Sequence, residues 1–265
     1  MKNFNITIGS DPEVFVQNAQ GEVVTAEGIV PGTKKAPHPI TDEGHAIQLD
    51  NVAMEYNIPP CKTRDEFVQH IHFVKDYLEM LASEHGLSLS PLASYELDPK
   101  YLQTENAKTF GCEPDFNAYR EEVNPRPEAV SLNLRSAGGH IAIGYPNYDF
   151  DISIEIVKAF DLFVVLPALL IDKDTRRREL YGKAGSFRFT NFGVECRSLS
   201  NFWINSKELT AWVYDQTIKA TECVLSGEWN ELKAQYPNVE EIINTGNVEK
   251  AKEVVKELQL DLITI

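Results

Sequence analysis

The sequence lacks the cysteine spacings of a zinc site or of a disulfide framework. Its four cysteines, Cys61, Cys112, Cys196 and Cys223, are scattered without a CxxC or CxxH pair. It also has no run of 18 apolar residues, and no apolar leader follows the first residues, which enter strand-like alternation at once. These absences predict reduced thiols, no membrane span, no export signal and a cytoplasmic location.

Basic residues are scarce: 25 Lys and Arg stand against 40 Asp and Glu, for a net charge of -15. Nucleic acids and anionic membranes both require a basic face, so neither is expected as a partner. A phosphate-bearing ligand must then be small, and local arginines, lysines and metal ions must hold it. Ser/Gly-rich linkers, repeats and low-complexity segments are missing too, so 265 residues with 43% hydrophobic content predict one domain, with its C-terminal helices over 206–258.

The stretch 181–203 is the one around which the chain is organised. Within it, Gly193 to Arg197 alternates as a strand, placing Glu195 and Arg197 on one face and Val194 and Cys196 on the other. A carboxylate and a guanidinium backed by apolar residues are typical of the floor of a charged site. Taken alone, the pattern fits a surface ion pair equally well.

Two earlier segments repeat this pattern of carboxylates on a strand. Residues 6–16 alternate so that Asp11 and Glu13 face the same way, and residues 22–26 form the partner strand of a hairpin. Residues 47–58 read as one further strand that presents Glu55. Asp50 has the wrong parity to join Glu55 unless a bulge or turn intervenes.

Three less regular segments complete the candidate site. The loop 28–44 carries Lys34 but fails the P-loop pattern, so both a solvated turn and a phosphate-facing loop remain open. Residues 110–119 set Glu113 and Asp115 among aromatics, a pattern that an ordinary turn also produces. Two strands are predicted over 130–134 and 138–144, and the second carries His140 behind paired glycines, which indicate that something approaches the backbone closely.

Helices are predicted on either side of these strands. A capping box at Thr63 opens one that ends near Gly86; His70 and His72 lie two apart on it, which predicts surface positions rather than a metal site. Residues 154–171 are apolar nearly all round and predict a buried helix kinked at Pro167. The basic run 176–178 is expected to be solvated, and further helices are expected over 206–225, 239–244 and 248–258.

Together the pattern predicts an α+β fold: a curved antiparallel sheet with a charged concave face, and helices packed on its other face. Carboxylates that share one face repel each other unless cations neutralise them. Mg²⁺ takes oxygen ligands and keeps phosphates in its shell, so the carboxylates imply a metal and the Arg and Lys side chains imply phosphate. This combination favours a nucleoside triphosphate held through metal ions and phosphoryl transfer chemistry.

The residues also carry a family resemblance. In order, GSDPEVFV, LDNVAMEYN, SAGGHIAIG and VECR resemble the E-x-E strand, the second carboxylate segment, the Gly-rich His strand and the E-x-R strand of the glutamine synthetase superfamily. With GTKK, FGCEPDFNAY and YGKAGSFR added, the set over 6–203 is most similar to the phage-type carboxylate-amine ligases (amidoligase type 2). The resemblance implies a ligase in which ATP and Mg²⁺, or Mn²⁺, phosphorylate a carboxylate and an amine then displaces phosphate to form an amide.

The resemblance also implies a role for each matching residue. The metal ligands would be Asp11, Glu13, Glu55, His140 and Glu195. The catalytic set would be Arg197, Arg188 and Glu195, and the nucleotide-binding set Lys183, Arg188, Lys34 and His140. Substrates would be bound by Glu113, Asp115 and Asp50.

Two positions depart from the superfamily pattern: Ala142 replaces a second His, and Asp11 replaces a Glu. The sequence shows no room for the small N-terminal domain through which glutamine synthetases share sites, so no ring assembly is expected. The alternatives are a non-catalytic phage binding or virion protein that retains the fold, and a guanidino kinase-like phosphotransferase. The expected partners are a small-molecule or peptide carboxylate and an amine, and the sequence names neither.

Overall fold

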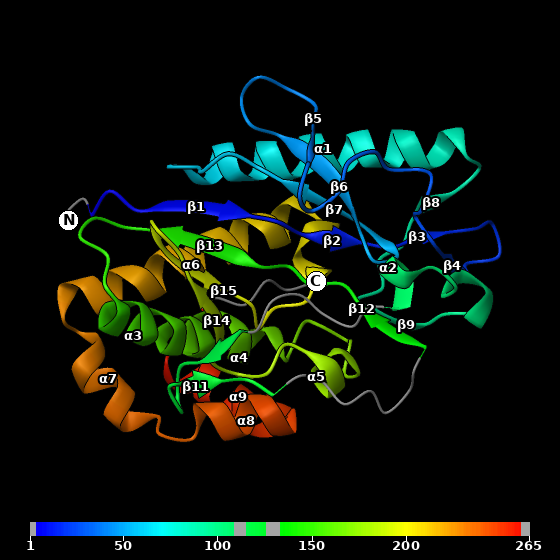
Figure 1. Cartoon of the computed structure of the whole chain (residues 1–265). Helices are drawn as coiled ribbons and strands as arrows, with labels where there is room; N and C mark the ends of the chain where they lie inside the picture. Colours follow the sequence, from blue (N-terminus) through cyan, green and yellow to red (C-terminus); the bar gives the residue numbers. More distant parts are fainter. Residues whose placement is uncertain (1–3, 109–114, 126–132, 261–265) are drawn as a thin grey trace.

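The computed structural model describes residues 4–108, 115–125 and 133–260. It combines antiparallel sheets with helices, which confirms the predicted α+β class (Figure 1). Within the described residues, no helix is long and apolar enough to cross a membrane.

The strands of the described residues are divided among four sheets rather than gathered in one. The largest has six strands, in the spatial order β1 (Thr7–Ser10), β13 (Ile141–Gly144), β15 (Gly193–Cys196), β14 (Ser186–Phe189), β10 (Phe116–Asn117) and β11 (Glu122–Val123). A four-stranded sheet has the order β2 (Glu13–Val14), β7 (Ala53–Asn57), β6 (Ala46–Asp50), β5 (His38–Pro39). The smaller sheets are β4 (Val23–Val24), β3 (Val16–Gln17), β8 (Ser88–Leu89), and β12 (Leu134–Ser136) with β9 (Ser94–Glu96).

The helices are α1 (Arg64–Glu84), α2 (Glu105–Lys108), α3 (Phe150–Phe160), α4 (Leu166–Ala168), α5 (Arg177–Leu180), α6 (Lys207–Ser226), α7 (Trp229–Gln235), α8 (Val239–Thr245) and α9 (Val248–Glu257). Two 3₁₀ turns cover Pro99–Tyr101 and Asn201–Asn205, and a π-helical segment covers Asp161–Val165. The predicted capping box at Thr63 is present and opens α1. The three predicted C-terminal helices are confirmed within a few residues, and α7 was not predicted.

Two predicted strands are in fact interrupted. The segment 6–16 breaks at Asp11-Pro12, because Pro12 has no N–H for a ladder, and its pieces β1, β2 and β3 enter three different sheets. The segment 47–58 folds back as the hairpin β6–β7, with Asn51 in the left-handed region at φ 54°. The prediction of one continuous strand was therefore wrong in both places.

The predicted buried helix over 154–171 is present but not regular. α3 passes through the π-helical segment into α4, so the deviation begins before Pro167 rather than at it. The carboxylate of Asp161, at the start of the π segment, accepts the backbone N–H of Gly185 at 2.6 Å. This contact ties the buried helix to the turn that leads into β14.

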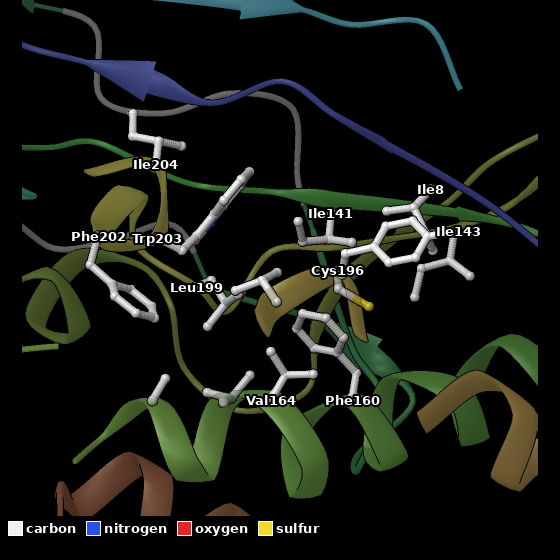
Figure 2. Packing of buried hydrophobic residues seen from close by; sticks show 14 of the residues in the cluster. Ile8, Ile141, Ile143, Phe160, Val164, Cys196, Leu199, Phe202, Trp203 and Ile204 are labelled. Carbon is white, nitrogen blue, oxygen red and sulfur yellow. The ribbon is translucent and has the colours of Figure 1, made fainter. Parts of the chain in front are cut away.

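The apolar face of the six-stranded sheet packs against this helix (Figure 2). Antiparallel pairing aligns Ile8, Ile143 and Val194 in one row. All three are completely buried, as is Phe160 on the helix opposite. Because side chains alternate along each strand, the next row of residues must face the other side of the sheet, where the polar site lies.

Candidate active site

The polar face of the large sheet carries the row Gly9, Ala142, Glu195 and Arg188, paired across neighbouring strands. One step further along the same strands lie Asp11, His140 and Arg197, just past the ends of the ladder. The sheet register therefore gathers side chains that are up to 186 positions apart in the chain, from Asp11 to Arg197.

The first group of ligating side chains is Asp11, His140 and Glu195. His140 Nδ1 lies 3.5 Å from Asp11 Oδ1 and 4.0 Å from Glu195 Oε1. Burial, followed by the charge of Arg197, holds the pKa of His140 well below its usual value, so the imidazole is neutral. Arg197 Nη1 lies 3.3 Å from His140 Nδ1, and since a guanidinium only donates, Nδ1 is the acceptor with its lone pair toward Arg197.

Two arginines accompany this group. Arg197 is buried and its Nη1 also contacts Glu195 Oε1, while Arg188 Nη1 lies 3.8 Å from the same oxygen. Burial raises the pKa of Asp11 to about 6, although the charges of Arg197 and Arg188 oppose the shift. Glu195 thus lies close to both guanidinium groups, and burial makes the ionised form of Asp11 less favourable.

The second group is Glu13, Asp50 and Glu55, all three buried. Glu13 pairs with Glu55 across β2 and β7, and Glu55 pairs with Gln48 of β6, two residues before Asp50. The hairpin turn supplies the change of parity that Asp50 needed. Asp50, predicted as a substrate residue, is therefore brought together with the two predicted metal ligands of this group.

The second group is short of positive charge. Burial and the charge of Asp50 raise the pKa of Glu13 to about 7. Burial and three neighbouring carboxylates raise the pKa of Glu55 well above its usual value. Lys34 Nζ lies 2.6 Å from Asp50 Oδ2 and Gly138 N–H donates to Glu13 Oε2 at 2.8 Å, but Glu55 Oε2 is buried and accepts no hydrogen bond from the described part of the chain. An orphaned carboxylate oxygen among acidic neighbours fits a divalent cation.

Members of both groups line one pocket, whose space including the part open to solvent is about 640 Å³. Glu13, Asp50, His140 and Arg197 line it, together with Asp115. Its apolar wall is formed by Phe15, Val52, Ala53, Leu134 and Leu180. The pocket is thus lined both by charged side chains and by apolar ones.

The pocket is also lined by two arginines that the sequence did not single out. Arg177 was predicted to be solvated, but it is buried, and its guanidinium donates to the carbonyls of Ser198 at 3.0 Å and Arg197 at 3.3 Å. Burial lowers the pKa of Arg177 to about 10. Arg135 is buried as well and donates to the carbonyl of Ala107. No local signal separates Arg177 from its two basic neighbours, because the fold alone turns it inward.

Other predicted residues lie elsewhere. Lys183 is exposed on the turn before β14 and is absent from the described lining of the pocket. Glu113 lies outside the described residues. The close approach predicted at the paired glycines is present, because Trp203 Nε1 donates to the carbonyl of Gly139 at 3.2 Å and a Cβ on Gly138 would lie 2.6 Å from His140 Nε2.

Residues 117–264 match the model of one protein family, described as phage phiEco32-like COOH.NH2 ligase-type 2. The chain belongs to this family. The match includes His140, Arg188, Glu195 and Arg197, so the first ligand group lies mostly inside it. A comparison with curated proteins gives no match.

Two solved structures are similar to nearly the whole of this chain. A bifunctional glutathione synthetase from Pasteurella multocida is similar over 97% of this chain and 47% of its own, with 12% identity and a TM-score of 0.48. GmaS without ligand is similar over 98% of this chain and 70% of its own, with 9% identity and a TM-score of 0.40. The chain thus spans about half the length of the glutathione synthetase.

Proposed function

We propose that this protein is an ATP- and Mg²⁺-dependent ligase that joins a carboxylate to an amine through an acyl phosphate. The observation that carries the proposal is that two groups of three ligating side chains reach one pocket beside Arg197, the first group through His140 and the second through Glu13 and Asp50. Two oxygen-rich groups about one pocket fit the metal ions that accompany a nucleoside triphosphate. Family membership supports the carboxylate-amine part of the proposal.

The donor set fits Mg²⁺ better than a softer ion at the second group, where all ligands are carboxylates. The first group adds the neutral His140, which Mn²⁺ also accepts. When bound, the ions would neutralise the carboxylates and draw charge from the phosphate oxygens. The raised pKa values of Glu13 and Glu55 show that the folded chain favours added positive charge here, whether from protons or from a cation.

The chain's own residues would then act on the substrates. A substrate carboxylate oxygen bonds to the terminal phosphorus of ATP as the bond to ADP breaks, and Arg197 and Arg188 donate to the oxygens on which charge accumulates. The amine nitrogen next bonds to the acyl carbon, phosphate leaves, and the nitrogen gives up a proton. Asp115, half-buried in the pocket lining, would bind the amine, and Lys34, about two-fifths of whose side chain is exposed, would reach the nucleotide phosphates.

The test has two stages. Calorimetric titration with ATP, in excess Mg²⁺ or in chelator, should show Mg²⁺-dependent binding that Glu195→Gln loses and that the exposed control Glu228→Gln keeps. Incubation with ATP, a panel of carboxylates and hydroxylamine should then yield a hydroxamate and free phosphate. Phosphate that remains on the product would instead indicate a phosphotransferase, and absence of ATP binding in every condition would overturn the proposal in favour of a binding protein.

A further inference from the structure

A third cluster of ligating side chains lies away from the candidate active site. Glu43 and His45 belong to the turn before β6, and His70 lies on α1; one ligand atom from each falls within 4.8 Å of the others. His45 stands at the opposite end of β6 from Asp50. Asp50 lies five positions after His45 along extended strand, a distance of roughly 17 Å, so this cluster is distinct from both carboxylate groups.

The two imidazoles face each other through ring nitrogens. His45 Nε2 lies 2.6 Å from His70 Nδ1, and His45 Nδ1 lies 2.7 Å from the hydroxyl oxygen of Thr41. When Thr41 accepts the Nδ1 proton, the lone pair of His45 Nε2 points at His70. A hydrogen bond to the remaining ring nitrogen is the usual way in which a metal-binding histidine is oriented.

This third cluster is buried at His45 and accessible to solvent at Glu43 and His70. His45 is 2% exposed, and the ring of Phe73 packs against it with centroids 5.1 Å apart. Glu43 is exposed and His70 half-buried, so an ion has access from solvent. The prediction that His70 and His72 are both surface residues is wrong for His72, which is buried against the hydroxyl of Thr210.

We propose that Glu43, His45 and His70 form a binding site for a divalent transition ion of intermediate softness, with Zn²⁺ as the first candidate. Two imidazoles and a carboxylate provide three ligands, and the fourth position is open to water. Tetrahedral Zn²⁺ with Zn–N bonds of about 2.0 to 2.1 Å sets its nitrogen ligands roughly 3.3 Å apart. The two rings must separate by less than an ångström from their present contact, which the half-buried His70 side chain permits.

The bound ion would have a structural role. It would tie the turn 41–45 to α1, and so fix one end of the loop 28–45. That loop carries Lys34, which pairs with Asp50 of the second ligand group. Metal binding would therefore restrict the movement of the loop that carries Lys34. The ion itself would not contact the reacting groups.

The experiment measures Zn²⁺ binding to the metal-free full chain by equilibrium dialysis, in excess Mg²⁺ to occupy the carboxylate sites. The variant His70→Gln is compared with His85→Gln, which alters an exposed histidine just past the end of the same helix. We expect His70→Gln to lose one Zn²⁺ equivalent, or to bind it at least tenfold more weakly, and His85→Gln to match the wild type. Equal stoichiometry and affinity in the two variants would overturn the proposal.

Two additional variants keep the test decisive if His70→Gln does not fold. Glu43→Gln changes an exposed side chain and should weaken Zn²⁺ binding about tenfold, and Thr41→Val should do the same through the orientation of His45. Co²⁺ in place of Zn²⁺ should give the visible absorption of a tetrahedral site in the wild type, which Glu43→Gln alters. Unchanged Zn²⁺ affinity and an unchanged Co²⁺ spectrum in Glu43→Gln would also overturn the proposal.

Discussion

Replacement of Glu13 by glutamine tests two properties of the second ligand group: the stability lost by burying its carboxylates together, and its binding of Mg²⁺. Glu13 is 8% exposed, and its pKa rises from 4.5 to about 7 through burial and the charge of Asp50. A glutamine has the same shape, and its amide oxygen still accepts the N–H of Gly138. Glu13→Gln therefore removes the negative charge and leaves the hydrogen bond.

The sign of the effect follows from linkage. A carboxyl whose pKa is raised by folding stabilises the native state below pH 4.5, and this contribution is lost as the pH rises through about 7. The difference between the two pKa values corresponds to about 3 kcal/mol in the free energy of unfolding, at about 1.4 kcal/mol for each pKa unit. In chelator, Glu13→Gln should match the wild type at low pH and exceed its free energy of unfolding by about 3 kcal/mol above pH 7.

Excess Mg²⁺ should reverse this order, because the wild type gains binding energy that Glu13→Gln has lost. Urea denaturation followed by tryptophan fluorescence, over a pH series with chelator or with Mg²⁺, measures both effects. Glu228→Gln is the control for removal of an exposed carboxylate. A difference between Glu13→Gln and wild type that is the same at every pH and unaffected by Mg²⁺ would refute the reasoning.

Three other substitutions test the surroundings of the site. Gly139→Ala places a Cβ against the indole nitrogen of Trp203 and should lower the free energy of unfolding in urea by about 2 kcal/mol or more; a neutral result would contradict the close packing. Arg177→Lys replaces two separate guanidinium nitrogens, one for each backbone carbonyl, by a single ammonium and should cost about 2 kcal/mol in the same assay, so full stability would show that the guanidinium is dispensable. Lys34→Met frees Asp50 for a cation, and calorimetry should show Mg²⁺ binding tighter by about fivefold and ATP binding weaker; tighter ATP binding would exclude Lys34 as a phosphate contact.

The sequence by itself determined the alternation that sorts charged from apolar side chains. Val194 and Cys196 are buried on the helix side, and Glu195 and Arg197 lie on the opposite side beside His140, as the period of two requires. It also determined α1, because the capping box at Thr63 is a local signal with a local partner. These features depend on residues at most a few positions apart.

Only the tertiary structure decided which charges meet. Asp50 joins Glu55 because a turn at Asn51 reverses the chain between them. Asp and Asn are common turn residues, but only the pairing of β6 with β7 decides that the chain turns here. Arg177 enters the pocket and His45 meets His70 through packing between distant elements, while their sequence neighbours remain exposed or point elsewhere. Strand register and helix docking are set by the burial of the whole core, so contacts across 25 or 130 positions, such as His45 to His70 and Ser10 to His140, cannot be read from local pattern.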